Sequence, residues 1–178
     1  MVDIWAYYNN ADEVELFLNG KSLGVKRKKG DDLHVMWHVK FEPGTLKAIS
    51  RKNGKIVLER EIKTAGIPAK IELIADRKSI LSNGNDLSFV TARIVDKDGN
   101  IVPYADNKIN FKIDDEAAIA GVDNGDPLSH ESFKSNSRNA FHGLALAIIQ
   151  ARLKPGSVNL TASSAGLAPA TVQIVLHQ

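Results

Sequence analysis

Short runs of alternating apolar and polar residues recur along this chain, with polar turns between them. In Glu13–Leu18 the even-numbered positions are valine or leucine, and the odd-numbered positions include both glutamates. This alternation predicts a strand with one face on a core and the other in water. Asn19-Gly20 then predicts a hairpin into Lys21–Lys26, because both residues tolerate the positive φ angles of a two-residue turn. Similar dipeptides stand at positions 53–54, 83–84, 98–99 and 124–125.

The same kind of pattern predicts further strands at 4–8, 33–41, 45–51, 56–62, 69–73, 86–95, 108–113, 157–163 and 170–176. Residues 144–153 (LALAIIQARL) are good helix formers, and propensity alone favours a helix there. Gly143 and Pro155-Gly156 limit that segment to about three turns. We predict instead a strand buried on both faces, because a short helix would interrupt a continuous strand pattern.

Residues 64–68 (TAGIP) interrupt the strand pattern with a glycine and a proline and divide the predicted strands into two groups. Short strands with polar turns on both sides of this segment indicate antiparallel β-sandwiches rather than a parallel sheet. We therefore predict an all-β chain of two tandem immunoglobulin-like sandwich domains, 1–65 and 67–178. The first is short for an independent core, and we expect it to depend on neighbouring structure.

Composition narrows the function classes. The 178 residues are 43% hydrophobic and 25% charged, as in ordinary globular proteins. A net charge of +2 gives no reason to expect nucleic acid or a membrane surface as partner. Without cysteine there is neither a disulfide nor a thiolate metal site. No signal peptide is recognisable, and the strand pattern starts almost at once, so we expect a fragment of a longer protein.

No set of residues has the spacing of a catalytic or metal centre. His34 and His38 would lie about 13 Å apart along a strand, too far to share one ion. The chain has neither a Gly-x-Ser-x-Gly elbow nor a P-loop. We therefore predict no catalytic residue and no cofactor.

Two acidic clusters need an interpretation. Asp123, Asp126 and Glu131 could hold Ca²⁺ through oxygen ligands. Their spacing fits no EF-hand, and Asp and Asn commonly cap turns instead. We predict no bound metal, with this loop as the alternative calcium site. Residues 114–116 (DDE) are interpreted as a solvated strand end.

Aromatic residues are the remaining candidates for ligand contact. Trp5, Tyr7, Trp37 and Tyr104, with Tyr8 beside them, could form a platform that stacks on sugar rings. Aromatics make up only 6% of the chain, and the two tryptophans lie in strand patterns, where core packing is the ordinary role. Sugar stacking requires exposed rings, which the sequence does not reveal.

Two motifs resemble one family of enzymes. Residues 4–24 (IWAYYNNADEVELFLNGKSLG) are similar to the small β-sandwich that follows the catalytic barrel in bacterial glycoside hydrolase family 2 β-galactosidases. The loop at 121–133 (GVDNGDPLSHESF), followed by RNAFHGL at 138–144, resembles the next, immunoglobulin- or invasin-like domain of those enzymes. Together the two matches extend over nearly the whole chain.

The resemblance implies an accessory role. The family uses two glutamates on a (β/α)₈ barrel of roughly 250 residues, which this chain cannot contain. No glutamate here matches those catalytic segments. We expect a non-catalytic C-terminal fragment of a retaining β-galactosidase-type enzyme that acts on β-galactosides or related glycans. Its partners would be the barrel and other domains of the same chain, with a glycan as a further candidate partner.

Two alternatives stay open, a carbohydrate-binding module and an adhesin-type structural domain. The resemblance also leads us to expect that the parent enzyme is periplasmic, secreted or at the bacterial cell surface. The fragment itself carries no evidence for that compartment.

Overall fold

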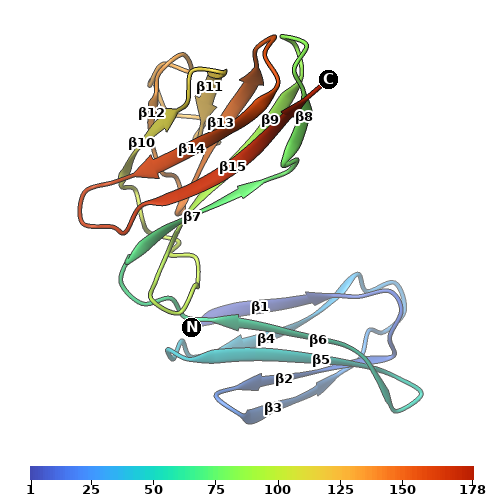
Figure 1. Cartoon of the computed structure of the whole chain (residues 1–178). Helices are drawn as coiled ribbons and strands as arrows, with labels where there is room; N and C mark the ends of the chain where they lie inside the picture. Colours follow the sequence, from blue (N-terminus) through green and yellow to red (C-terminus); the bar gives the residue numbers. More distant parts are fainter. The chain divides into compact units, whose positions relative to one another are not determined.

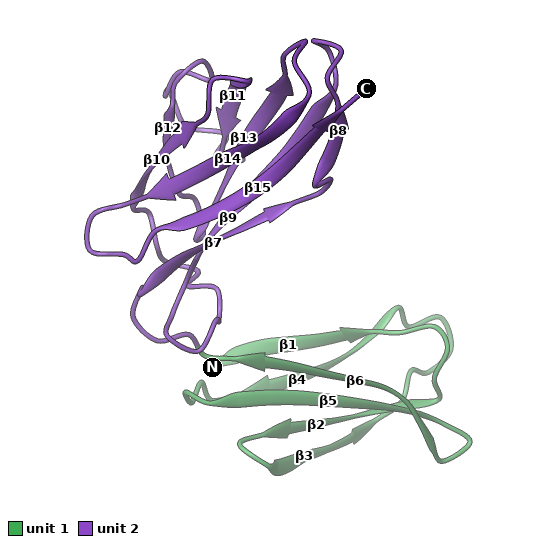
Figure 2. Ribbon diagram, in the orientation of Figure 1, with its two compact units in different colours: residues 1–64 green, residues 65–178 purple.

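The computed structural model describes all 178 residues as fifteen strands and no helix. No helix is therefore long and apolar enough to cross a membrane. The chain forms two compact units, residues 1–64 and 65–178 (Figures 1 and 2). The prediction of an all-β chain is confirmed.

Unit 1 is a six-stranded sandwich with unequal sheets. Its strands are β1 (Val2–Tyr7), β2 (Glu13–Leu18), β3 (Lys21–Lys26), β4 (His34–Val39), β5 (Thr45–Lys52) and β6 (Lys55–Lys63). One sheet has the order β3-β2-β5-β6, and the other contains only β1 and β4. All pairs are antiparallel. Val14, Leu16, Val35 and Trp37 form the buried core between the sheets.

The predicted hairpin turns of unit 1 are present. Asn19 and Gly20 have φ angles of 52° and 80°, and Asn53 and Gly54 have 49° and 74°. Two successive positive φ values are typical of the type I′ turn, whose twist matches that of the flanking strands. The Asn-Gly dipeptides thus join β2 to β3 and β5 to β6.

Unit 2 is a larger sandwich with one well-filled core. Its strands are β7 (Lys70–Ala75), β8 (Ser79–Leu81), β9 (Leu87–Val95), β10 (Lys108–Ile113), β11 (Ala117–Asp123), β12 (Ser137–Asn139), β13 (Leu144–Ala151), β14 (Gly156–Ser163) and β15 (Ala170–His177). The sheets have the orders β12-β10-β14-β15-β8 and β11-β13-β9-β7. Only β8 departs from the expected antiparallel arrangement, because it runs parallel to β15.

Residues 144–151 form the strand β13, as predicted against their helix propensity. β13 lies between β11 and β9 in its sheet. The prediction that β13 is buried on both faces was wrong, however. Ala145, Ala147, Ile149 and Ala151 are buried, whereas the alternate positions are half-buried or, at Leu144, exposed. The second sheet covers only one face of β13, so tertiary packing decides its conformation and leaves its other face partly in solvent.

Candidate functional site

The outer face of the two-stranded sheet in unit 1 carries an exposed aromatic cluster. On β1, Ile4 and Ala6 pack against the core, so Trp5 and Tyr7 point outward. The register pairs Tyr7 with His34 of β4. The His34 ring stacks on Trp5 with a centroid distance of 4.9 Å and lies 5.0 Å from the Tyr7 ring. Trp5 nevertheless keeps 54% of its surface exposed.

Polar and flexible groups border these rings. Asp3 pairs with His38 across the ribbon, and their side chains lie 2.5 Å apart between Oδ1 and Nδ1. Met36 pairs with Trp5 and is also exposed. We call Trp5, Tyr7 and His34 the aromatic cluster. Rings with a polar border can stack on a sugar or pack against protein, because their faces are apolar and their edges are polar.

The other aromatic candidates lie elsewhere. Trp37 is 3% exposed in the core of unit 1, with the Lys26 ammonium 5.6 Å from its ring centroid. The Tyr8 hydroxyl accepts a hydrogen bond from the Lys28 backbone at 2.9 Å. Tyr104 belongs to unit 2, where its hydroxyl donates to the Gly66 carbonyl at 3.0 Å. Of the four predicted contact residues, only Trp5 and Tyr7 therefore come together.

The rings of the aromatic cluster do not form a flat platform. The Trp5 and Tyr7 rings are 6.4 Å apart and inclined at 62°, an edge-to-face arrangement. His34 was absent from the predicted contact residues, because its place beside Tyr7 depends on a pairing between strands about thirty residues apart. No local pattern in the sequence predicts that pairing.

The acidic loop of unit 2 surrounds a guanidinium group. Arg138 is 1% exposed, and its Nη1 donates to the Glu131 carbonyl oxygen at 2.9 Å. Its Nη2 donates to Asn124 Oδ1 at 3.0 Å and lies 3.4 Å from Asp123 Oδ1. Asp126 instead caps the backbone amide of Leu128. The alternative calcium site is thus a loop in which an arginine supplies the positive charge between Asp123 and Glu131.

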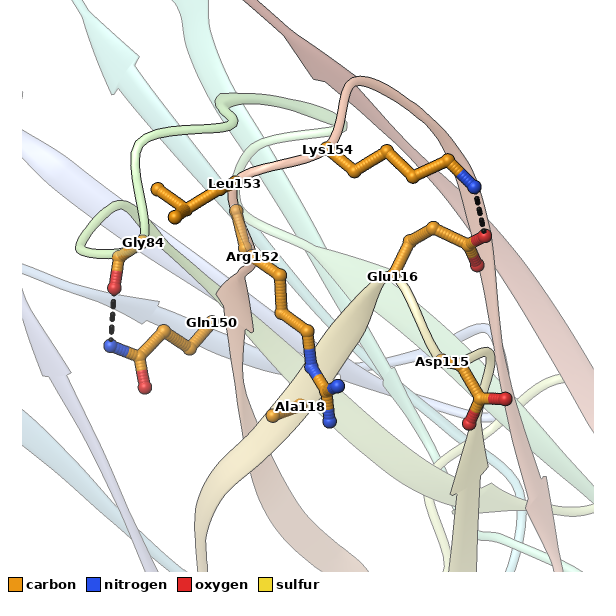
Figure 3. A pocket seen from close by; sticks show the side chains of 9 residues that line it. Gly84, Asp115, Glu116, Ala118, Gln150, Arg152, Leu153 and Lys154 are labelled. Carbon is orange, nitrogen blue, oxygen red and sulfur yellow. Dashed lines mark hydrogen bonds and ion pairs between the residues drawn. The ribbon is translucent and has the colours of Figure 1, made fainter.

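A hollow of about 720 Å³ lies at one end of unit 2, where Asp115 and Glu116 approach Arg152 and Lys154. Figure 3 shows Arg152 extending past Ala118, and Lys154 directed at Glu116. The Lys154 ammonium is 3.1 Å from Glu116 Oε1, and this hydrogen bond lowers the pKa of Glu116. A glycosidase acid needs a raised pKa so that it holds its proton at neutral pH. Glu116 has the opposite shift.

Every carboxyl group whose pKa is shifted has a pKa below its ordinary value. Hydrogen bonds from Ser22 and Arg51 lower the pKa of Glu15. The Arg77 guanidinium lowers the pKa of Asp86 to about 2. The backbone amide of Gly66 and the side chain of Asn100 hold the pKa of Asp96 well below its usual range. These carboxylates accept structural hydrogen bonds, and none is prepared to donate a proton.

Comparisons with known proteins agree with the two motifs. Residues 71–173 match the glycoside hydrolase family 2 C-terminal domain 5 model, and residues 1–58 match a domain of unknown function (DUF4982). The beta-galactosidase BoGH2A of Bacteroides ovatus is 56% identical over 97% of this chain. A putative beta-glucuronidase of Formosa agariphila is 35% identical over 87% of it.

Solved structures have the same arrangement of strands. A glycosyl hydrolase family 2 member from Bacteroides cellulosilyticus superposes with a TM-score of 0.91 at 37% identity, over 97% of this chain and 24% of its own. A beta-glycosidase from Bacteroides vulgatus gives 0.92 at 28% identity, over 98% of this chain and 22% of its own.

This chain spans only 20% of the length of the Bacteroides ovatus relative and 15% of that from Formosa agariphila. The resemblance inferred from the two motifs is confirmed, because a family model matches more than half of the chain. The chain belongs to the glycoside hydrolase family 2 C-terminal domain 5 family.

Proposed function

We propose that this chain is the non-catalytic C-terminal part of a larger retaining glycosidase that acts on β-galactosides or related β-glycosides. Its two sandwiches would support the catalytic domain of the parent enzyme. One observation carries the proposal: at 56% identity, almost the whole chain corresponds to a fifth of a protein named as a beta-galactosidase.

Physical features of the chain support the same function. A retaining mechanism needs two carboxyl groups about 5–5.5 Å apart, one of them protonated at neutral pH. Asp115 and Glu116 line the same hollow, but the lysine ion pair keeps Glu116 ionised. The barrel that holds the catalytic pair in this family needs roughly 250 residues, which is more than the 178 residues of this chain. Hydrolysis would therefore belong to another part of the parent enzyme.

Three proteins test this function: the parent enzyme, the parent without the region of this chain, and this chain alone. Hydrolysis of 4-nitrophenyl β-D-galactoside and β-D-glucuronide is measured for each, together with thermal unfolding. We expect no turnover from the chain alone and a lower melting temperature for the truncated parent. Turnover by the chain alone would overturn the proposal. So would a truncated parent with unchanged activity and unchanged melting temperature.

The aromatic cluster favours a second function, glycan binding. Trp5 is exposed beside polar Asp3 and His38, a combination that suits one stacked sugar ring with hydrogen bonds at its edge. Affinity electrophoresis in gels containing galactan or a polysaccharide with β-glucuronide residues tests it, with Trp5→Ala as the variant and the exposed Tyr104→Ala as the control. Retardation that only Trp5→Ala abolishes would support binding. Equal mobility with and without polysaccharide would exclude it for these glycans.

A further inference from the structure

Strand β6 of unit 1 has almost no cover on either face. It is the edge of the four-stranded sheet, and all nine of its residues are exposed. Its register with β5 pairs Ile62 with Leu46 and Leu58 with Ser50. Because Leu46 packs against the core, Leu58 and Ile62 face the interior side of the sandwich. They are exposed because no strand of the opposite sheet lies beneath them.

An apolar groove follows from this arrangement. It has a volume of about 250 Å³, and its walls include Leu58, Arg60 and Ile62 from β6 and Ile4 and Ala6 from β1. Arg60 forms no hydrogen bond or ion pair with another side chain of the protein. Exposed apolar side chains on an edge strand are usually covered or blocked, because they invite pairing with another chain.

The free edge of β1 borders the same groove. β1 pairs only with β4, so its other edge presents unpaired amides and carbonyls. Figure 1 shows β1 next to β6, and side chains of both strands line the groove. An immunoglobulin-type sandwich has seven strands, four in one sheet and three in the other. Unit 1 has four and two, and the position of a third strand is beside β1 and beneath β6.

We propose that an extended segment of the parent polypeptide, preceding β1 in sequence, adds as a third strand to the free edge of β1. This inference rests on the proposed function, in which the chain is part of a longer enzyme. Its matched relative is about five times as long, and the matched family model describes a C-terminal domain, so most of the parent precedes these residues. Neighbours in sequence are also commonly neighbours in a sheet.

The groove determines the chemistry of the added strand. Alternate side chains of the segment would be apolar, to cover Leu58 and Ile62, with an oxygen acceptor placed to meet Arg60. Its backbone would pair with the free groups of β1, as in other cases of strand addition to a sheet edge. The completed sandwich would then have sheets of four and three strands.

The test compares this chain with a version extended at its N-terminus by about 15 residues encoded upstream in the parent gene, enough for a strand and its connection. A version with the added residues in scrambled order is the control. Hydrogen exchange is measured for the alternate β1 amides that point away from β4. We expect the natural extension to slow them by at least about tenfold and to raise the melting temperature of unit 1 by about 4 °C or more.

Two matched substitutions identify the surface that the strand covers. Ile62 is 69% exposed and faces the groove, whereas Ile56 is 55% exposed and pairs with Arg51 on the opposite face. Ile62→Ser should lower the melting temperature more in the extended chain than in the present one. Ile56→Ser should lower it equally in both. A unit 1 that folds only with the natural extension would also support the proposal.

Three results would overturn the proposal: equal exchange in the natural and scrambled versions, protection of β1 only in the intact parent, or protection that appears only when two copies of the chain associate. The second result would assign the groove to another domain, and the third to a second copy. None of them affects the activity and stability comparison that tests the accessory function, so the two proposals can fail separately.

Discussion

Replacing Arg138 with methionine should strongly destabilise unit 2. Arg138 is fully buried, and its guanidinium donates to the Glu131 carbonyl at 2.9 Å and to Asn124 Oδ1 at 3.0 Å. These two acceptors lie in the connection between β11 and β12, seven and fourteen residues before the arginine. The side chain therefore holds a long loop against the sheet.

The magnitude follows from these contacts. A hydrogen bond that involves a charged group contributes about 1.5–3 kcal/mol, so the two short bonds together contribute about 3–6 kcal/mol. The carboxylates of Asp123 and Glu131 lie 3.4 and 3.7 Å from the guanidinium and are partly exposed. Water screens them, and they add little. Methionine fills part of the space, so we expect a loss of about 3–5 kcal/mol, in the range for a broken buried ion pair.

Differential scanning calorimetry on the full chain measures this loss. For a unit of this size, about 4 °C of melting temperature corresponds to 1 kcal/mol, so Arg138→Met should lower the transition of unit 2 by about 12–20 °C. Arg152→Met, at an exposed position, is the matched control. Arg138→Lys should lose most of the same stability, because one ammonium cannot reach both acceptors. A shift for Arg138→Met no larger than that of the control would refute the reasoning.

Two pairs of variants and one single variant test other parts of the structure. In thermal unfolding, Gly143→Ala should lower the free energy of unfolding by more than about 3 kcal/mol, because the added Cβ would lie 2.5 Å from the Val102 carbonyl oxygen. Gly125 has a similar φ but open space around it, so Gly125→Ala should lower that free energy by only about 1 kcal/mol. Equal losses would contradict the predicted clash. Trp37→Ala should lower the free energy of unfolding by about 3–5 kcal/mol, whereas Trp5→Ala should change it by less than about 1 kcal/mol. The reverse order would contradict the placement of Trp37 in the core and of Trp5 at the surface. Asp86, whose pKa is lowered to about 2, stabilises unit 2 fully above the unfolded pKa of about 4, and this contribution disappears as the pH falls toward 2. Acid unfolding of Asp86→Asn should therefore depend less on pH in that window, and an unchanged profile would refute the assignment.

Local chemistry makes the strands and turns of this protein predictable from its sequence. The alternation in residues 13–18 and the Asn-Gly pair that follows specify a strand and a type I′ turn without reference to the rest of the chain. β13 needed one more argument, because its alanines favour a helix. The choice rested on the continuous strand pattern around the segment, which a short helix would have interrupted, and in the structure packing between β11 and β9 holds it as a strand.

The candidate sites were less predictable, because they depend on contacts between distant residues. Trp5 and Trp37 lie in equally apolar segments, yet one is exposed and the other buried. Pairing between β1 and β4 only fixes which residues share a face, and packing against the four-stranded sheet decides which of the two faces is buried. Arg138 is a further example. Arginine is ordinarily a surface residue, so its burial follows only from the loop that returns over it.

The core of unit 1 is much smaller than that of unit 2, and this difference links the proposed added strand to the proposed accessory role. The core of unit 2 contains 22 buried residues in 114, whereas that of unit 1 contains four in 64. A small domain buries a small fraction of its apolar surface and is correspondingly marginal. The uncovered side chains of β6 are part of that deficit, because a third strand beside β1 would cover Leu58 and Ile62. A sandwich that depends on a strand from the rest of the parent enzyme would fold only in its company, which is the behaviour expected of an accessory domain and not of an independent binding module.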